Sequence, residues 1–514
     1  MVSDVGAIGC AAGLIVGAGR SVVLVLIDTT RGAIMHTDVL VVGAGPTGMM
    51  VANELLLAGV STVVVDRLSR RSELSRAGGV QSRTLAALDQ RGLLEPLLAT
   101  GDYPISAGHF AGFPLSLDFA RHRLPWRSVP QVVIEGFLEE HLATHGLRVR
   151  RDHELVAIDQ DSDGVTATFA DGTALRGRYL VAADGAHSTV RSLLRVDFPG
   201  QSGTATVVAA DVRLGGVDDR MSHVWSPDGH WAAVFPLGTD SQGRRLSRLV
   251  LGGPRHSLPR DVEVTEEEIR ESLRTVLGSN ARLLELRYGR RITDTARQAA
   301  QYRHGRVLLA GDAAHVHLPL GAQGMNTGMQ DAINLGWKLG ATVRGWAPDG
   351  LLDTYHAERH PAGAAVLRNV QAQCLVMDWA GTRAPDVLAT KELLTDLARL
   401  PDVQRHLGDL MSGMAIRYAM PGVDRHPLIG RPVPDLPLDP TRLHALLRSG
   451  RGILLDPEGE HGKLADLWSD RVDHVDYVRQ GTEPMLVRPD GYVCWAGDPD
   501  DLEPALGHWF GQAG

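Results

Sequence analysis

The stretch from Asp38 to Asp66 constrains the fold of this chain more than any other. It begins with a short apolar run, residues 39–42, and continues with Gly43, Gly45 and Gly48 in the spacing G-x-G-x-x-G. In such a fingerprint the first glycine allows a tight turn and the second lets the backbone approach a pyrophosphate. The third lets the following helix pack closely on the strand. The pattern therefore predicts a buried strand, a turn and a helix that together bind a dinucleotide.

The residues that follow complete a strand–helix–strand unit. Val51, Leu55 and Leu56 recur at helical spacing, and residues 63–65 form a second apolar run that ends at Asp66. A carboxylate at that position can accept hydrogen bonds from the hydroxyl groups of an adenosine ribose. A glycine triplet alone also occurs in ordinary turns between core elements. Here a strand, the glycine triplet, a helix, a second strand and an acid stand in the order of a dinucleotide-binding unit. This combination favours the dinucleotide site.

The charge and the cysteine content exclude several classes of protein. The chain has 514 residues and a net charge of −9, without basic runs. This length suffices for about two to four domains. Nucleic-acid binding needs clustered Lys and Arg, so we expect no nucleic-acid partner. The three cysteines form no C-x-x-C pair, which excludes a disulfide framework and is typical of a reducing cytoplasm.

Residues 1–36 precede the dinucleotide unit and are largely apolar. Arg20 interrupts the apolar run 5–27, and a charge at the centre of a membrane-spanning helix costs roughly 2.5–3.5 kcal/mol. The basic segment that begins a signal peptide is also missing. We therefore expect residues 1–36 to be a dispensable extension, and we expect no association with a membrane.

A second acidic position follows a predicted strand in the middle of the chain. The segment 153–183 has the turns and the alternation of a small β-meander, and its last strand leads to Asp184-Gly185. An acid beside a glycine at the start of a helix can position a pyrophosphate or a ribose. This pair is therefore a second candidate contact for a dinucleotide.

The character of the chain changes between residues 201 and 299. Apolar and polar residues alternate there, which predicts an antiparallel sheet. Trp225, Trp231 and Phe235 lie within it. Their rings could stack on an aromatic ligand or fill the core of the sheet, and the sequence leaves both readings open.

Another glycine-rich stretch lies between residues 306 and 340. A predicted strand over 307–310 ends at Gly311-Asp312, and after a proline-glycine loop a helix begins near Gly324. Backbone amides at a helix start carry roughly half a positive charge, which suits the anionic edge of a reduced flavin. His315 and His317 form an H-x-H pair, but no third ligand is spaced nearby, so we expect no metal site.

Three motifs stand in one order: GAGPTG with Asp66, the pair Asp184-Gly185, and GD at Asp312 with its glycine-rich helix. Together they resemble the single-component FAD aromatic hydroxylases related to para-hydroxybenzoate hydroxylase, over about residues 37–375. Residues 354–360 (TYHAERH) look most like those of angucycline-type hydroxylases. The tail, with RPDGYVCWA, looks like the thioredoxin-like domain of the aromatic-polyketide branch.

The resemblance implies an α/β fold with three domains. A Rossmann-like FAD-binding domain spans residues 37–200 and 300–420, and an antiparallel β-sheet substrate domain, 201–299, is inserted in it. A C-terminal thioredoxin-like domain spans residues 421–514. It lacks the C-x-x-C of redox thioredoxins, so we expect it to act by packing and not by disulfide exchange.

The resemblance also implies which residues hold the cofactor. Besides the glycines at 43, 45, 48 and 324, FAD would be held by Thr47, Asp66, Arg67, Arg76, Gln131, Asp312, Met325 and Asn326. Asp184 would serve both the flavin and a passing nicotinamide, and Pro319 and Gly321 would lie near the flavin ring. Arg83 could reach the flavin or lie in a solvated surface segment. No side chain is assigned as a catalytic acid, base or nucleophile.

The implied activity is that of a monooxygenase. NADPH or NADH reduces FAD, oxygen forms a C4a-hydroperoxide, and a polycyclic aromatic polyketide takes one oxygen atom. Three alternatives stay open: Baeyer–Villiger oxygenation, a flavin reductase or dehydrogenase without oxygen insertion, and a non-catalytic FAD-binding protein. The single glycine fingerprint is consistent with a nicotinamide that visits and leaves. We expect a cytoplasmic monomer or homodimer.

Overall fold

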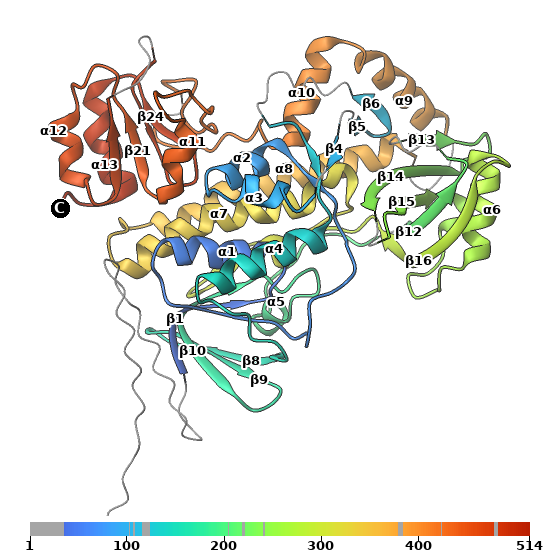
Figure 1. Cartoon of the computed structure of the whole chain (residues 1–514), viewed down its shortest axis with the longest axis horizontal. Helices are drawn as coiled ribbons and strands as arrows, with labels where there is room; N and C mark the ends of the chain where they lie inside the picture. Colours follow the sequence, from blue (N-terminus) through green and yellow to red (C-terminus); the bar gives the residue numbers. More distant parts are fainter. Residues whose placement is uncertain are drawn as a thin grey trace, which may run out of the picture.

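The computed structural model describes residues 35–101, 103–105, 108–115, 124–203, 205–217, 222–239, 242–378, 384–422, 424–476 and 482–514. The expected N-terminal extension lies outside these residues, except for its last two. A central sheet lies under long helices, with a second sheet at one end of the molecule and a C-terminal unit at the other (Figure 1). Within the described ranges, no helix combines the length and the hydropathy that crossing a membrane requires.

The central sheet is built on the strand–helix–strand unit that the sequence predicts. Strand β1 (Met35–Val42), helix α1 (Pro46–Leu57) and strand β2 (Thr62–Val65) follow one another, and β2 pairs with β1 in parallel. Strand β10 (Ala174–Ala182) pairs in parallel with the other edge of β1, and β19 (Val307–Leu309) pairs in parallel with β10. The prediction for this unit is confirmed.

The order β2-β1-β10-β19 joins strands that are far apart in the sequence. Residues 39–42 of β1 are buried, as expected for an apolar strand that is covered on both faces. Because the four strands are parallel, their carboxyl ends lie at one edge of the sheet, where open α/β sheets bind ligands. The predicted meander is confirmed, since β8 (Leu155–Gln160) and β9 (Val165–Phe169) extend β10 in antiparallel pairs.

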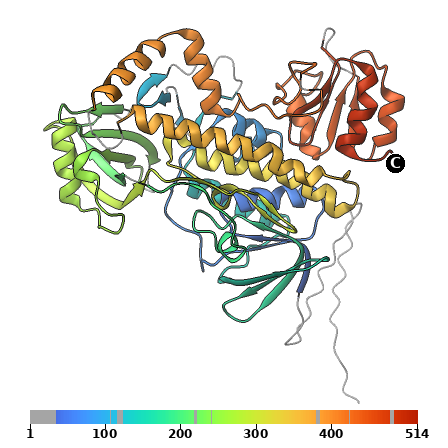
Figure 2. The ribbon, with the colours of Figure 1, turned by 180° about the vertical axis from the view of Figure 1, so that it is seen from behind.

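Helices α1, α4 (Gln131–Thr144) and α7 (Gln323–Arg344) lie over one face of the central sheet (Figure 1). Helices α1 and α7 approach closely because α7 presents a glycine at the contact: a Cβ on Gly336 would lie 2.2 Å from the Cβ of Glu54. Helix α8 (Thr354–Val376) packs beside α7. Seen from behind, these two helices run from the second sheet to the C-terminal unit (Figure 2).

The second sheet has the order β13-β14-β15-β12-β16, and all its pairs are antiparallel. The antiparallel sheet predicted for residues 201–299 is therefore confirmed. One face packs on helix α6 (Glu266–Leu277) through residues such as Ala232 and Val234. The opposite face, with Trp231, packs on Leu318, on Leu320 and on α8. The strands are β12 (Thr206–Gly215), β13 (Ser222–Trp225), β14 (Trp231–Thr239), β15 (Arg245–Gly252) and β16 (Arg282–Thr293).

The C-terminal unit holds a four-stranded sheet in the order β22-β21-β23-β24. Strand β21 (Gly452–Leu455) is parallel to β22 (Val472–Val475) and antiparallel to β23 (Met485–Val487), which pairs antiparallel with β24 (Val493–Ala496). Cys494 lies buried in β24, and burial raises the pKa of its thiol. A buried thiol with a raised pKa is a poor nucleophile for disulfide exchange.

Shorter elements connect these units. They are β3 (Gly79–Val80), α2 (Ser82–Asp89), α3 (Leu94–Leu98), β4 (Tyr103–Pro104), β5 (Gly108–Phe110), β6 (Phe113–Leu115), β7 (Arg127–Ser128), α5 (Thr189–Leu193), β11 (Gly200–Gln201), β17 (Ala296–Gln298), β18 (Arg303–His304), β20 (His315–Val316), α9 (Pro385–Leu397), α10 (Pro401–Ser412), α11 (Leu443–Leu446), α12 (Gly462–Ala465) and α13 (Leu502–Phe510).

Candidate functional site

The three glycines after β1 differ in the space around them. Gly43 has a φ of 104°, and a Cβ on it would lie 2.3 Å from the carbonyl oxygen of Ala183. A Cβ on Gly48 would lie 1.9 Å from the carbonyl oxygen of Gly43. A Cβ on Gly45, in contrast, would meet no described atom within 4 Å. Two of the glycines are therefore required by the fold itself, whereas Gly45 borders open space among the described residues.

Asp66 lies beside this turn, at the end of β2. Its Oδ2 accepts a hydrogen bond from the backbone N–H of Ala44 at 2.8 Å, and its Oδ1 accepts one from Leu68 at 2.9 Å. The Arg151 guanidinium is 3.8 Å from the same carboxylate. The acid is thus held next to the glycine turn, where a ribose would lie if a dinucleotide were bound.

Asp184 lies just beyond the end of the neighbouring strand β10. Its Oδ2 accepts a hydrogen bond from the backbone N–H of Val190 at 3.1 Å. Its Oδ1 is buried and accepts none from the described residues, and burial raises the pKa of this carboxyl. A buried polar atom without a partner needs an explanation, and a donor on a bound ligand supplies one.

The third strand of this edge, β19, ends at the turn Gly311–Ala313, in which Asp312 is exposed. Strands β1, β10 and β19 are parallel neighbours. The glycine turn, Asp184 and Asp312 are therefore brought to the same edge of the sheet. These residues, with their open space and the unpaired carboxylate oxygen, fit a dinucleotide such as FAD.

The backbone before helix α7 takes an uncommon conformation. Gly321 and Ala322 have φ angles of 66° and 55°, and the helix begins at Gln323. Left-handed φ costs little at Gly321 but is strained at an alanine, and such strain is concentrated at functional sites. Pro319 is exposed just before this turn, and the half-buried Gly324 and Met325 lie in the first turn of α7.

Two residues predicted to hold FAD have hydrogen-bond partners within the protein, and their contacts with FAD stay predictions. The Asn326 amide donates to the carbonyl groups of Gly79 and Ala322, at 2.9 and 2.7 Å, and its oxygen accepts from the N–H of Gln81. It therefore holds the turn before α2 against α7, and both amide hydrogens are used within the protein. The Gln131 amide donates to Glu135 at 2.7 Å.

The other predicted residues are placed as follows. The Thr47 hydroxyl lies against Gly311 and Gly328, so that it packs α1 on the end of β19. Arg67 and Arg76 are exposed. The reading of Arg83 as part of a solvated surface is wrong: it is buried, and it donates to the carbonyl oxygen of Asp490 in the C-terminal unit at 2.7 Å. Its contact with a flavin stays a prediction.

Trp225, Trp231 and Phe235 lie on the same face of the second sheet, against Leu318 and Leu320. Trp231 is only 2% exposed and serves as core. Trp225 and Phe235 are half-buried, and the Nζ of Lys391 lies 3.9 Å from the centre of the Trp225 ring. The three aromatic residues are thus brought together beside the loop that precedes α7.

Two histidines that the sequence does not point to lie on this face as well. The ring centroids of His109, in β5, and His223, in β13, are 4.2 Å apart. Burial, with the neighbouring His223, lowers the pKa of His109 to about 3, and burial lowers that of His223 to about 4. Both rings are therefore uncharged at neutral pH.

The histidine pair leads us to expect a loss of stability in acid. A histidine in an unfolded chain has a pKa near 6.5, so the unfolded chain binds protons that these two rings do not bind in the folded protein. The free energy of unfolding therefore falls as the pH drops below about 6.5. We expect the substitution His223→Gln to reduce the loss between about pH 7 and pH 5 by about 2 kcal/mol, as measured by urea unfolding. An equal loss in both proteins would contradict this role of His223.

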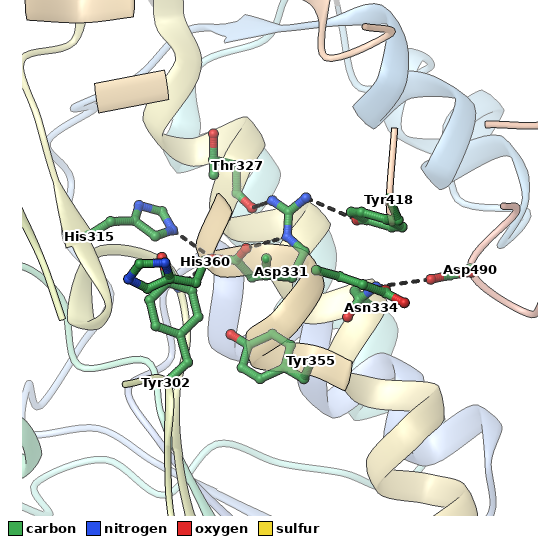
Figure 3. A network of polar contacts seen from close by, with 12 residues as sticks. Tyr302, His315, Thr327, Asp331, Asn334, Tyr355, His360, Tyr418 and Asp490 are labelled. Atoms are coloured by element: carbon green, nitrogen blue, oxygen red, sulfur yellow. Dashed lines mark hydrogen bonds and ion pairs between the residues drawn. The ribbon is translucent and has the colours of Figure 1, made fainter. Parts of the chain in front are cut away.

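A buried network of polar side chains connects the end of β19 to helices α7 and α8 (Figure 3). Asp331 accepts hydrogen bonds from His315 at 2.7 Å, from Arg359 at 2.6 Å and from the N–H of Gly311 at 3.1 Å. Burial opposes the charge of Asp331, but Arg359 and His315 hold the pKa of its carboxyl below the ordinary value. His315 is thus bound to a carboxylate, so the network explains its burial without a metal.

The network continues into the C-terminal unit. Arg359 donates to the Tyr418 hydroxyl at 3.0 Å. Directly before Arg359 in α8, Glu358 accepts from Arg488 at 2.7 and 2.9 Å and from Lys338 at 2.8 Å. Arg488 also pairs with Asp490. This second half, which we call the Arg488 cluster (Asn334, Lys338, Glu358, Arg488 and Asp490), is buried where α7 and α8 meet the C-terminal unit.

One group of side chains among the described residues has the spacing of metal ligands: Asp89, Asp435 and His444. Two arginines already pair with its carboxylates, Arg448 with Asp89 and Arg442 with Asp435. The group is therefore best described as an ion-pair cluster that ties α2 to the C-terminal unit.

The chain matches two protein families over most of its length. Residues 36–370 match the family described as FAD binding domain, and residues 426–513 match the family described as aromatic-ring hydroxylase, C-terminal. The resemblance found in the motifs is thereby confirmed at the level of the family.

Relatives with known names cover nearly the whole chain. A 12-dehydrotetracycline 5-monooxygenase/anhydrotetracycline 6-monooxygenase of Streptomyces rimosus subsp. rimosus is 43% identical over 514 residues, which include 93% of this chain and 99% of that protein. The structure of CabE, an aromatic hydroxylase from angucycline biosynthesis, is 37% identical with a TM-score of 0.81, and 93% of this chain and 100% of that one are covered. The Diels-Alderase PyrE3, from the biosynthetic pathway of pyrroindomycins, is 34% identical with a TM-score of 0.79, at the same coverage of 93% and 100%.

The site and the relatives point to the same family. The family match with the FAD-binding domain covers more than half of the chain, and its residues form the edge at which β1, β10 and β19 end. This chain therefore belongs to the FAD-dependent aromatic-ring hydroxylases, the class A flavoprotein monooxygenases related to para-hydroxybenzoate hydroxylase.

Proposed function

We propose that this protein binds FAD at the shared edge of β1, β10 and β19, uses NADPH or NADH as reductant, and inserts one atom of O2 into a polycyclic aromatic polyketide. The observation that carries the proposal is the meeting of three features at this edge. They are the open space at Gly45, the carboxylate of Asp66 and the unpaired oxygen of Asp184. The named tetracycline and angucycline relatives support the substrate class.

Each part of this edge has a role in the proposal. The turn at Gly45 lies against the pyrophosphate, Asp66 accepts the adenosine ribose, and Asp184 and Asp312 face the rest of the cofactor. The first turn of α7, with Gly324 and Met325, offers backbone N–H groups at its positive end to the flavin. Bound FAD supplies the electron transfer and the activation of oxygen, and the protein supplies position and exclusion of water.

The other units take their roles from their positions. The second sheet, residues 201–299, carries the half-buried Trp225 and Phe235 beside the loop before α7, which suits an aromatic substrate next to the flavin. The unit 421–514 has a parallel pair β21–β22 followed by two antiparallel strands, which supports our proposal of a thioredoxin-like domain. With Cys494 buried, this unit acts by packing on α7 and α8.

The nicotinamide reacts transiently in this proposal, because the sequence contains a single dinucleotide fingerprint. We therefore expect a polycyclic phenol to accelerate the anaerobic reduction of the bound flavin by NADPH or NADH at least about tenfold. Stopped-flow absorbance measures this rate with and without the phenol. After oxygen is admitted, mass spectrometry of the product tests for one added oxygen atom.

The outcomes separate the candidate activities. Rapid reduction without a phenol, or a product without added oxygen, would favour a flavin reductase. A product that gains one oxygen as an ester or lactone would identify a Baeyer–Villiger reaction. The mass of the product is essential, because a relative of the same fold and 34% identity is named a Diels-Alderase.

A further inference from the structure

The histidine pair beside the second sheet has no role in the FAD site described above. His109 and His223 come from β5 and β13, with their ring planes tilted by 53°. Strand β5 contacts the short turn Leu320–Ala322 that leads into α7. In Figure 1 strand β5 lies between helix α9 and the second sheet. The pair is therefore close to the part of the chain assigned to the flavin ring.

Aromatic rings surround the pair. The ring of His223 is nearly parallel to that of Trp225, at 6.1 Å and 22°, and it meets Phe235 edge-on at 5.5 Å and 81°. The centroid of His109 lies 6.0 Å from that of Phe235. Trp225 and Phe235 pack in the same cluster as Leu318 and Leu320. Planar walls of this kind bind a planar polycycle by stacking.

Among the described residues, the two imidazoles have few hydrogen-bond partners. The N–H of Gly112 donates to Nδ1 of His109 at 3.3 Å, so the neutral ring carries its proton on Nε2. In the part of the chain that the structure describes, His109 has no other hydrogen-bond partner and His223 has none. No described carboxylate forms an ion pair with either ring. A neutral imidazole presents one donor and one acceptor.

We infer that His109 and His223 form a subsite that recognises the hydroxyl and carbonyl oxygens on one edge of a planar, uncharged polycyclic substrate. The inference rests on the proposed function, and it adds how the substrate is selected. The Nε2–H of His109 donates to a carbonyl oxygen, and a ring nitrogen of His223 accepts from a hydroxyl.

An uncharged edge is favoured for two reasons. A carboxylate placed here would lose its hydration without a cation at the histidines to replace it. Two cations close to this cluster are engaged elsewhere. Lys391 is held over the ring of Trp225. Arg248, which lies opposite Phe235, donates to the carboxylate of Asp211. The pair therefore selects hydroxy-ketone polycycles against small aromatic acids.

The experiment measures binding to the FAD-loaded full chain, without turnover. The probes are 1,8-dihydroxyanthraquinone, which has hydroxyl groups next to a carbonyl, and anthraquinone, which lacks the hydroxyl groups. Quenching of tryptophan fluorescence gives the dissociation constant of each probe. The variants are His223→Phe, which keeps an aromatic ring, and His223→Asn, which keeps hydrogen-bonding groups.

We expect the wild-type protein to prefer the dihydroxy probe about fivefold. Both probes offer a carbonyl oxygen to His109, so the hydroxyl groups add only the hydrogen bond to His223, and one net hydrogen bond contributes about 1 kcal/mol. His223→Phe should weaken binding of the dihydroxy probe about fivefold to tenfold and leave anthraquinone within about twofold. His223→Asn should restore part of the preference. The dissociation constants of the same two probes, measured for His109→Gln, test the second member of the pair.

Two results would overturn the inference. One is an equal loss for both probes in His223→Phe, which would assign the pair to packing alone. The other is equal binding of both probes by the wild-type protein. Either result is independent of the proposed function, because flavin reduction and the mass of the product are measured separately. Conversely, a protein that binds as expected but adds no oxygen would reject the monooxygenase and keep the subsite.

Discussion

Substitution of Gly45 by valine is expected to weaken the binding of FAD strongly while the protein still folds. A Cβ at this position meets no described atom within 4 Å, so the apoprotein has room for the larger side chain. The backbone of Gly45 has a φ of −77°, which any residue can adopt. The methyl groups of valine would instead occupy the space that the proposal gives to the pyrophosphate.

The expected loss of FAD affinity is at least about tenfold to a hundredfold, because overpacking a close contact typically costs 1–3 kcal/mol. The ratio of absorbance at 450 nm to that at 280 nm in purified protein measures the bound flavin. Circular dichroism and the urea midpoint of the apoprotein show whether the fold is kept. Gly507→Val is a matched control, since a Cβ at Gly507 in α13 also meets nothing within 4 Å. Full flavin in Gly45→Val would place the cofactor elsewhere.

Gly48 shows why the choice of glycine matters. A side chain there would collide with the carbonyl oxygen of Gly43 at 1.9 Å, so any loss of FAD in a Gly48 variant would be inseparable from misfolding. The sequence predicts both glycines from one motif. Only the structure separates the glycine that the fold requires from the one that borders open space.

Local patterns were sufficient to predict the backbone of the site. The apolar run of β1, the glycine spacing and the helical periodicity of α1 act between residues that are close in the chain, so each is visible in the sequence. The same holds for the alternation in residues 201–299, which predicted the second sheet. Three separate strand ends met at one edge because parallel strands place their carboxyl ends together.

Side-chain partners could not be predicted in the same way. The motif places Asn326 at the start of α7, but its amide turns to the backbone of Gly79 and Gln81, which come from a distant segment. The basic segment that contains Arg83 reads as a surface or a phosphate contact, yet its guanidinium reaches Asp490. His109 and His223 carry no local signal, because their contact depends on how two chain segments cross.

The substitution Arg488→Met is expected to give the largest loss of stability of any change considered. Arg488 donates to both carboxylate oxygens of Glu358 and pairs with Asp490, and all three side chains are buried. Methionine fills much of the same volume, but it removes the positive charge and the hydrogen bonds that Arg488 gives to two buried carboxylates. Lys338 and Asn334 are then the remaining donors to Glu358. Removing one partner of a buried ion pair typically costs about 3–5 kcal/mol.

Urea unfolding of the apoprotein measures this loss, and two further variants identify its cause. In Arg274→Met the lost ion pair, with Glu267, is mostly exposed, so we expect a change within about 0.5 kcal/mol. In the double variant Arg488→Met/Glu358→Gln one uncompensated charge is removed, so it should lose less stability than the sum of the two single variants.

If Arg488→Met unfolds at the wild-type urea concentration, the C-terminal unit does not depend on this cluster for its attachment to α7 and α8. If instead the loss of stability appears as expected, the buried charges of the Arg488 cluster hold the C-terminal unit against α7 and α8, the two helices that carry Asp331 and Arg359. The C-terminal unit would then act on the proposed FAD site through packing, without any redox chemistry of Cys494.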